Sequence, residues 1–372
     1  MRIKDIAITS YRNIASAHVE LGPGANVLYG ANANGKTNAL ECMYMFAVAR
    51  PFRDAQAADL VRHGETRALA AMRFEREGRD RGDAARFSIT VKKQRQFVMN
   101  GAHVSKVSEF IGFFRAVLFT PDHLALIKGA PENRRRFLDM AIAQLRPVYI
   151  SCLSAYSNVL SQRNALLKLV REGRAGAAEL EVWTQKLAEY GSAVTAYRAE
   201  YMKKLSASAP GFYVGLSGAE GMDLGYYSQA AMQGADPGDA ARVREVYAAL
   251  YRGGTDMEIK QGMSLFGPHR DDITVKIGGH GARSMASQGQ QRSAVLAMKL
   301  AEGEISKEIC GEYPVFLLDD ILSELDRGRQ RYIMDSLGGR QVVVTCCSPE
   351  VYGISADAAM FEVRAGEITR VR

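Results

Sequence analysis

One short segment near the N-terminus constrains the fold of this chain more than any other part of the sequence. Residues 30–37 read GANANGKT and match the phosphate-binding loop pattern G-x-x-x-x-G-K-[ST]. An apolar run at 26–29 predicts a strand before this loop, and apolar residues at helical spacing between 40 and 48 predict a helix after it. Strand, loop and helix in this order predict an α/β fold with a site for nucleotide phosphates. A glycine-rich turn without a ligand is the alternative.

The pattern assigns a chemical role to each part of this loop, called the P-loop below. Its glycines let backbone N–H groups surround the β-phosphate, and the following helix adds the partial positive charge of its N-terminus. Lys36 is predicted to contact the β- and γ-phosphates, and Thr37 to bind Mg²⁺. The predicted ATP-binding residues are Gly30, Ala31, Asn32, Ala33, Asn34, Gly35, Lys36, Thr37 and Asn38.

Two carboxylates end a second apolar strand. Residues 315–318 read VFLL, and Asp319 and Asp320 follow directly. In an ATPase with a P-loop, the first such carboxylate holds Mg²⁺ through water and the second polarises the attacking water. We therefore predict that Thr37 and Asp319 serve the metal, and that Asp320 and Lys36 are catalytic. The alternative is an aspartate that caps the helix after the strand.

A third segment, SQGQQR at 287–292, precedes a helix predicted from apolar residues between 295 and 309. Ser287 and Gln290 have the spacing of a capping box, which is a purely structural role. The same hydroxyl, the backbone N–H of Gly289 and the helix N-terminus can also bind an anion. The spacing alone leaves both interpretations open.

Between these motifs the chain changes character. Further strands are predicted at 3–8, 18–21, 87–91, 97–100, 116–120, 259–266, 273–277 and 342–345. Between 153 and 205, apolar residues recur in steps of three and four, which predicts an antiparallel helical hairpin with its turn at 172–178. Arg163 falls in the apolar seam and is expected to extend its charge to solvent or to lie near a helix end. Residues 208–239 are predicted to form loops and short pieces.

Composition restricts the class of protein only mildly. The 372 residues allow about two domains. Residues 1–13 carry too many charges for a signal peptide, and an apolar run of about 18 residues is missing, so we expect a cytoplasmic chain without a membrane span. The five cysteines lack the spacing of metal ligands and are expected to be reduced. With 48 Lys and Arg against 41 Asp and Glu, the net charge of +7 favours a polyanionic partner.

Taken together, the three motifs resemble the ABC-type ATPase heads of the SMC-like proteins and, more narrowly, the bacterial RecF family. Supporting stretches lie at 10–13, 119–124, 134–139 and 267–272, and the resemblance covers nearly the whole chain. It implies an α/β, P-loop ABC-type ATPase head with an inserted antiparallel helical-hairpin arm. The head would comprise residues 1–150 and 251–372, with the arm at 151–250.

The resemblance also implies a function. ATP and Mg²⁺ would join two copies into a homodimer, in which the signature residues of one copy complete the site of the other. The dimer would bind DNA, both duplex and single-strand/duplex junctions at gaps, and act with RecR and RecO to place a recombinase. Implied site residues are Ser287, Gln288, Gly289 and Gln290 in the signature, and Ser323, Glu324, Leu325 and Asp326 in the D-loop beside the dimer seam.

Three positions depart from the pattern of transporter-type ABC ATPases. Gln288 stands where they carry Gly, Asp320 where they carry Glu, and residues 346–348 read CCS where they carry His. Because Asp is one methylene shorter than Glu, we expect slow turnover. The missing His leaves a contact to the γ-phosphate unassigned, with Thr345 and Ser348 as candidates.

The DNA-binding surface is predicted from basic clusters alone, and a solvated surface is the alternative. Rival functions are a transporter ATPase subunit, an SMC-type DNA tether and a nucleotide-sensing scaffold with little hydrolysis. The arm, the altered signature and the missing His disfavour the transporter subunit, and the short arm disfavours the SMC-type tether, whereas the third stays open. Candidate DNA contacts are Lys92, Lys93, Arg95, Arg134, Arg135 and Arg136.

Overall fold

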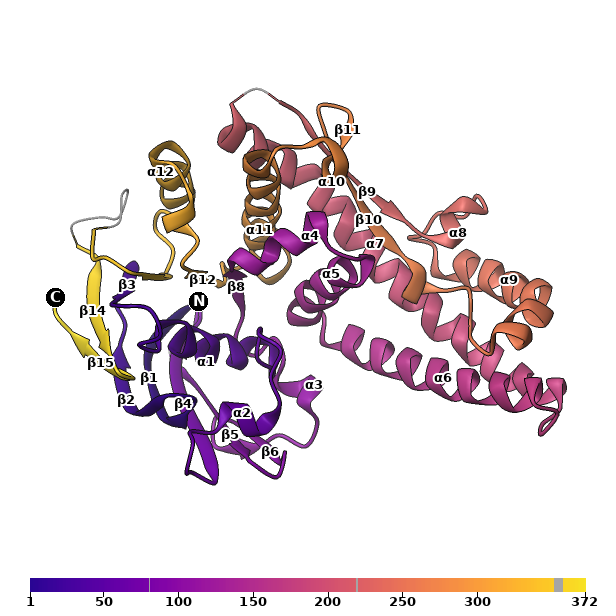
Figure 1. Cartoon of the computed structure of the whole chain (residues 1–372), viewed down its shortest axis with the longest axis horizontal. Coiled ribbons are helices and arrows are strands. Elements are labelled where there is room, and N and C mark those ends of the chain that lie inside the picture. The colour runs from indigo at the N-terminus through magenta and orange to yellow at the C-terminus, as the bar shows by residue number, and fades with distance from the viewer. Residues whose placement is uncertain (80, 219, 351–356) are drawn as a thin grey trace. The chain divides into compact units, whose positions relative to one another are not determined.

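The chain is organised in two units that interleave along its sequence. The computed structural model describes residues 1–79, 81–218, 220–350 and 357–372. Unit 1 comprises Met1–His123, Gly215–Gly218 and Val295–Arg372, and unit 2 comprises Leu124–Val214 and Ala219–Ala294. Figure 1 traces the chain through both units, and its mixture of strands and helices confirms the predicted α/β class.

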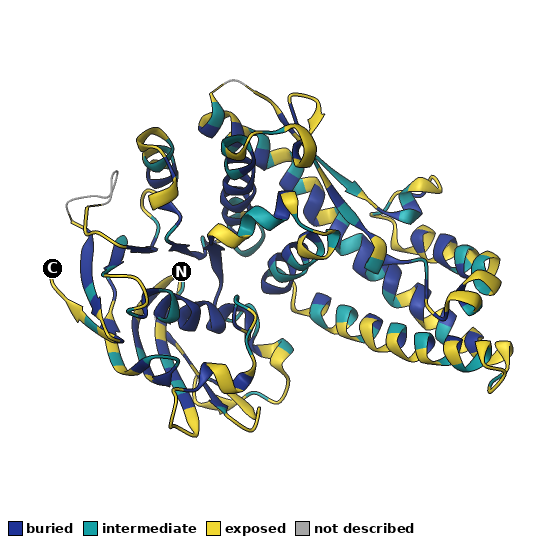
Figure 2. Cartoon of the chain, viewed as in Figure 1, coloured by how far each residue is buried: buried dark blue, intermediate teal, exposed yellow. Residues whose placement is uncertain are grey.

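Unit 1 contains a mostly parallel, six-stranded sheet in the order β15-β14-β3-β13-β12-β8. Strands β12 and β13 are buried along their whole length and are apolar except at their ends (Figure 2), as expected of a sheet covered on both faces. Register pairs Asp319 of β12 with Thr345 of β13. The strands are β3 (Ala25–Tyr29), β8 (Ala116–Phe119), β12 (Val315–Asp319), β13 (Val342–Cys346), β14 (Ala359–Arg364) and β15 (Glu367–Arg370).

A second, antiparallel sheet of unit 1 has the order β2-β1-β4-β5-β6-β7. Its strands are β1 (Arg2–Tyr11), β2 (Ile14–Glu20), β4 (Arg67–Glu75), β5 (Asp83–Thr90), β6 (Arg95–Met99) and β7 (Ala102–His103). Helix α1 (Lys36–Val48) contacts strands of both sheets, which explains why it is apolar nearly all round. The other helices of this unit are α2 (Ala57–Leu60), α3 (Val107–Phe110) and α12 (Arg327–Ser336).

Unit 2 combines long helices with a three-stranded antiparallel sheet in the order β11-β10-β9. Its strands are β9 (Met222–Tyr227), β10 (Asp272–Ile277) and β11 (His280–Gly281). Two helices are divided between the units, with residues 215–217 of α7 and residues 295–310, the larger part of α11, in unit 1. The helices are α4 (Ala125–Lys128), α5 (Pro131–Leu145), α6 (Pro147–Arg171), α7 (Leu180–Ser217), α8 (Gln229–Met232), α9 (Ala240–Gln261), α10 (Ala282–Met285) and α11 (Gln288–Cys310).

The two helices predicted between 153 and 205 are present as α6 and α7, and the predicted turn lies between them. Two other predictions were wrong. The first 10 residues of the segment predicted as loops, 208–217, are instead the end of helix α7, which continues through Pro210 to Ser217. Ala209 and Tyr213 are fully buried there, so packing outweighs the helix-breaking proline. The strand predicted at 259–266 is instead the end of α9 and an irregular segment. Of the predicted loop segment 208–239, residue 219 lies outside the described residues.

Arg163 was expected to reach solvent, and this prediction was wrong, because its side chain is fully buried. Its guanidinium donates hydrogen bonds to Glu258 Oε2 at 2.6 Å, Ser264 Oγ at 2.7 Å and Thr184 Oγ1 at 3.1 Å. It also lies 5.0 Å from the ring centroid of Tyr251. The buried cation is tolerated because α9, which the sequence pattern missed, supplies a buried carboxylate.

Within the part of the chain that the structure describes, no helix combines the length and apolar character needed to cross a bilayer.

Candidate nucleotide-binding site

The P-loop connects β3 to α1, as predicted, and its glycines are required by its geometry. Gly30 and Gly35 have φ angles of +150° and +108°, where a side chain is strained. A Cβ on Gly30 would lie 2.3 Å from the backbone oxygen of Val363, and one on Gly35 would lie 2.7 Å from Asn13 Oδ1. The loop is therefore a tightly held turn whose conformation excludes larger residues at both glycines.

Lys36 folds back over this loop. Its Nζ donates hydrogen bonds to the backbone oxygens of Gly30 at 2.7 Å and Ala31 at 3.0 Å, and the residue is buried. Carbonyl oxygens are neutral acceptors, whereas phosphate oxygens are charged and make stronger hydrogen bonds with an ammonium group. The lysine can therefore exchange these carbonyls for phosphates without leaving the loop.

The structure brings the predicted metal residues together at the carboxyl end of β12. Thr37 Oγ1 donates a hydrogen bond to Asp319 Oδ1 at 2.8 Å. Burial raises the pKa of the Asp319 carboxyl, while hydrogen bonds from Thr345 and Thr37 act in the opposite direction. A hydroxyl and a carboxylate are the hard oxygen ligands that Mg²⁺ takes alongside phosphate and water. Among the described residues no group of three or more His, Cys, Asp or Glu could hold a metal, so an ion here needs those additional oxygens.

Asp320 lies directly after this strand, in the left-handed backbone region with φ of +50°. Ser323 Oγ donates hydrogen bonds to its backbone oxygen at 2.7 Å and to its Oδ1 at 2.9 Å. The carboxylate caps no helix: the cap of α12 is Asp326, whose side chain accepts a hydrogen bond from the backbone of Arg329 at 3.0 Å. Of the four predicted D-loop residues, Ser323 thus contacts the predicted catalytic carboxylate directly. Glu324 and Asp326 are exposed, and Leu325 is buried.

The signature segment forms the predicted capping box at the start of α11. The backbone N–H of Ser287 donates to Gln290 Oε1 at 2.7 Å, and that of Gln290 donates to Ser287 Oγ at 3.2 Å. Gln290 Nε2 also donates to Glu220 Oε2 at 2.5 Å. Ser287 and Gln288 are exposed and Gly289 is half-buried, so this helix N-terminus is open to an anion as well as capped.

Comparison with known proteins agrees with these motifs. The family model described as RecF/RecN/SMC N terminal domain matches residues 2–368. The "DNA replication and repair protein RecF" of Bacillus velezensis is 36% identical over 100% of both chains, and that of Bacillus subtilis is also 36% identical over 100% of both. The chain belongs to the RecF family.

Solved structures of this family share the fold. The recombination mediator protein RecF of the RecFOR pathway, determined with ATP, has a TM-score of 0.91 and 31% identity, with 100% of this chain and 98% of that chain covered. A Pyrococcus furiosus Smc head domain matches with a TM-score of 0.58 at 16% identity, covering 100% and 96% of the two chains, and so shows a common head fold alone.

A cleft of about 910 Å³ adjoins the P-loop of this RecF family member. Its lining combines cationic and amide side chains, and sequence reasoning had singled out only one of them, Asn38, as a site residue. Three consecutive hydrogen bonds connect the lining of this cleft to the P-loop. Arg53 donates to Asn38 Oδ1 at 2.6 Å, Asn38 donates to Asn13 Oδ1 at 2.7 Å, and Asn13 donates to the Ala33 oxygen at 3.4 Å. The lining residues are Arg12, Asn13, Asn38, Arg53, Ala58, Asp59, Val61, Arg62 and His63.

Glu41 binds Arg12 and Arg53, two of the arginines that line this cleft. It is fully buried on α1 and accepts hydrogen bonds from Arg12 at 2.5 Å and Arg53 at 3.0 Å, as well as from Tyr11 at 3.1 Å. Burial alone would raise the pKa of Glu41, but the hydrogen bonds and charges of Arg53 and Arg12 lower it below its ordinary value. One sequence signal could have found this group, namely a single acidic residue within an otherwise apolar helix.

The predicted basic clusters differ in how available they are. Lys92 and Lys93 are exposed in the turn between β5 and β6, and Arg95 is exposed while donating to the Ala49 oxygen at 3.2 Å. Arg134 is buried in an ion pair with Asp272 at 2.6 Å, and Arg135 donates to the Asp271 oxygen at 2.9 Å. Arg136 is half-buried. In this structure Arg134 and Arg135 are thus engaged in holding the 267–272 segment in place.

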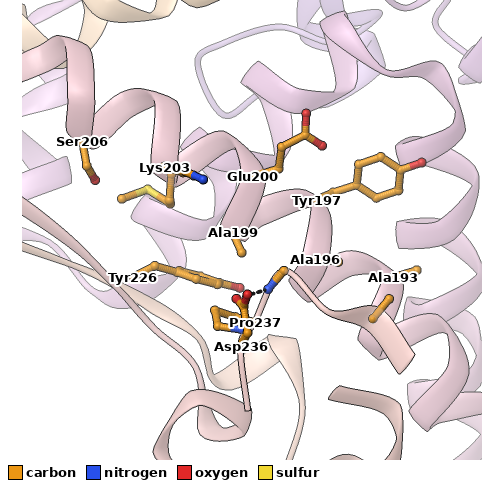
Figure 3. A pocket seen from close by; sticks show the side chains of 13 residues that line it. Ala193, Ala196, Tyr197, Ala199, Glu200, Lys203, Ser206, Tyr226, Asp236 and Pro237 are labelled. Carbon is orange, nitrogen blue, oxygen red and sulfur yellow. Dashed lines mark hydrogen bonds between the residues drawn. The ribbon is translucent and has the colours of Figure 1, made fainter. Parts of the chain in front are cut away.

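Figure 3 shows a second hollow, of about 750 Å³, within unit 2. Alanines of α7 line it together with Asp236, Pro237 and Gly238, and Asp236 Oδ1 accepts a hydrogen bond from the Gly238 backbone at 2.9 Å. Its lining contains none of the residues predicted to bind nucleotide.

Proposed function

We propose that this chain is an ATP-dependent DNA clamp of recombinational repair and replication-fork maintenance, which binds DNA at gaps and helps to load a recombinase. The observation that carries the proposal is the hydrogen bond between Thr37 and Asp319. It places a hydroxyl and a carboxylate 2.8 Å apart beside a P-loop, which is the donor pair that Mg²⁺ bound to a nucleoside triphosphate requires.

In this proposal the residues of unit 1 divide the work. The P-loop N–H groups and Lys36 bind the β- and γ-phosphates, and Thr37 and Asp319 hold Mg²⁺. When bound, Mg²⁺ neutralises charge on the phosphate oxygens. Asp320 accepts a hydrogen bond from the attacking water and orients it, while Ser323 fixes the carboxylate. Slow hydrolysis follows from the short Asp320 side chain and would reset the clamp.

The cleft beside the P-loop is proposed to hold the nucleoside part of ATP. Its volume of about 910 Å³ is ample for a base and a ribose, and the amides of Asn13 and Asn38 offer donors and acceptors. The arginines that Glu41 holds are suited to face the α-phosphate side, because their charges are already fixed in place.

A second copy of the chain is proposed to complete the site. Ser287, Gln288 and Gly289 lie at the N-terminus of α11, where backbone N–H groups and the helix dipole favour a phosphate. With these residues supplied in trans, nucleotide would join two copies, and Ser323 to Asp326 would lie near the seam.

The polyanionic and protein partners are proposed from charge and from the relatives. Lys92, Lys93 and Arg95 are exposed together and can contact DNA phosphates without reading base sequence. A solved RecF relative is a recombination mediator of the RecFOR pathway, and we propose that RecO and RecR are partners of this chain too. We propose that the chain performs this role in the cytoplasm.

Light scattering of the purified chain without nucleotide, with ADP and with ATP tests this function, each with and without gapped duplex DNA. We expect dimers that appear with ATP and carry DNA. Lys36→Met, which removes the phosphate-binding ammonium, should bind ATP weakly and remain monomeric. A wild-type chain that binds ATP but stays monomeric under all conditions would refute the clamp and favour a nucleotide-sensing scaffold.

A further inference from the structure

We propose that Thr345, the penultimate residue of β13, is a positioning residue of the metal site, which orients Asp319 and holds the turn at Asp320. The inference rests on the proposed ATPase function. It assigns a role to the strand end where transporter-type ATPases carry a histidine and this chain carries two cysteines.

Thr345 is 1% exposed and lies opposite Asp319 in the parallel register of β12 and β13. Its Oγ1 donates a hydrogen bond to Asp319 Oδ1 at 2.8 Å. The same oxygen accepts a hydrogen bond from the Asp320 backbone N–H at 3.0 Å. A threonine hydroxyl has one proton to donate, so the metal carboxylate receives that proton while the next residue is held by a lone pair.

The bond to Asp319 fixes the orientation of the proposed metal carboxylate. In the described part of the chain, Thr37 and Thr345 supply the side-chain hydrogen bonds to Oδ1 of Asp319. Thr37 can bind the metal through a lone pair of its hydroxyl and still donate its proton to Asp319. Thr345 is buried and bonds the same oxygen from the neighbouring strand, so the two hydroxyls together fix the orientation of the carboxylate.

The bond to Asp320 stabilises an unusual backbone conformation. Asp320 has φ of +50°, a region that residues with a side chain seldom adopt and that persists where the surroundings hold it. Its N–H donates both to the backbone oxygen of Thr345 at 3.2 Å and to the Thr345 hydroxyl. In this conformation the Asp320 carboxylate accepts the hydrogen bond from Ser323. One hydroxyl therefore couples the metal carboxylate to the proposed catalytic one.

The neighbouring residues do not duplicate this role. Cys346 Sγ contacts the Ser348 oxygen at 2.9 Å, and Cys347 Sγ contacts Asn32 Oδ1 of the P-loop at 3.1 Å. Both partners of the Thr345 hydroxyl belong to the turn of Asp319 and Asp320, so we place it beside the metal carboxylate, whereas the sequence had made it a candidate contact of the γ-phosphate.

The test compares Thr345→Val, which removes the hydroxyl at nearly constant volume, with Thr345→Ser, which keeps it. Three measurements are made on the full chain: ATPase rate against Mg²⁺ concentration, Mn²⁺ binding to the chain with ADP by electron paramagnetic resonance, and binding of a fluorescent ATP analogue in EDTA. For Thr345→Val we expect Mn²⁺ affinity about tenfold weaker and a correspondingly higher Mg²⁺ requirement, with metal-free nucleotide binding unchanged. Thr345→Ser should restore both metal readouts.

Thr195→Val is the matched control, because Thr195 is equally buried and its hydroxyl bonds Tyr247 at 2.8 Å in unit 2, outside the proposed site. It should leave metal binding unchanged. If Thr345→Val does not fold, Thr345→Ala removes the same hydroxyl and carries the same expectation. Wild-type metal binding in the hydroxyl-free variant, or failure of Thr345→Ser to restore it, would overturn the inference. A wild-type chain that binds no ATP would refute the proposed function itself.

Discussion

Several polar residues buried in this chain are bonded to partners far away in the sequence. Glu41 meets Arg12 and Arg53, Arg163 meets Glu258, and Thr345 meets Asp319. Local spacing cannot reveal such pairs, because each depends on which strands or helices become neighbours. This is why the motif residues of the candidate site could be predicted, whereas the pairing of Glu41 with Arg12 and Arg53 could not.

The buried ion pair of the arm leads to a prediction on stability. Arg163→Met leaves the carboxylate of Glu258 buried without its cation, which should lower the free energy of unfolding by about 3–5 kcal/mol. Urea unfolding followed by the fluorescence of Trp183, the chain's single tryptophan and the neighbour of Thr184 on α7, measures this change.

Arg174→Met is the matched control, because the pair of Arg174 and Glu172 is exposed on the same turn. Its free energy of unfolding should change by less than about 1 kcal/mol. An equal, small effect of both substitutions would show that the buried charge of Glu258 does not depend on Arg163.

At the scale of elements, strands and helices with a single clear pattern were predicted well. The run before the P-loop, the two buried strands β12 and β13 and the helix α11 are confirmed. Strand β4 was missed because its sequence RALAAMRFE is rich in alanine, which has little preference for strands. Helix α9 was missed, and its end was predicted as a strand, because an apolar run of this length fits either element until tertiary packing decides.

The start of α11 allows its structural and functional roles to be separated. Ser287→Asp keeps a strong N-cap but places a negative charge where the proposed trans site binds phosphate. We expect its thermal stability to stay close to that of the wild type and its ATP-driven dimer to be lost in light scattering. Ser287→Ala loses the acceptor for the Gln290 N–H and should cost about 1 kcal/mol.

Asp239→Ser is the control for a change of capping residue. Asp239 is exposed and caps α9 by accepting hydrogen bonds from Ala241 and Arg242 at 3.1 Å. This exchange should preserve both stability and dimer formation. If Ser287→Asp also formed ATP-dependent dimers, the segment would be a helix cap alone.

At the scale of the whole molecule, the units are assembled from segments that are distant in the sequence. Unit 1 consists of three segments and unit 2 of two. Periodicity yields only contiguous ranges, so the sequence could not have revealed that α7 and α11 each belong to both units. The division into a head at 1–150 and 251–372 and an arm at 151–250 stays a prediction, which truncated chains and binding assays on each part would test.

The net charge of +7 is also a property of the whole molecule, and it separates two explanations of DNA binding. If the β5–β6 turn binds phosphates, the double variant Lys92→Glu, Lys93→Glu should bind gapped duplex DNA more weakly in the presence of ATP. The slope of log affinity against log salt should become shallower by roughly 0.9 for each phosphate that the variant no longer neutralises. Fluorescence anisotropy over a salt series measures both quantities.

The control for this charge reversal lies in unit 2. The double variant Lys260→Glu, Lys276→Glu makes the same change of net charge at exposed residues and should keep the wild-type slope, because these lysines lie outside the β5–β6 turn. Equal weakening of DNA binding in both double variants would mean that overall charge, and not the turn, attracts the DNA, since the field of the whole molecule responds to net charge wherever the charge lies.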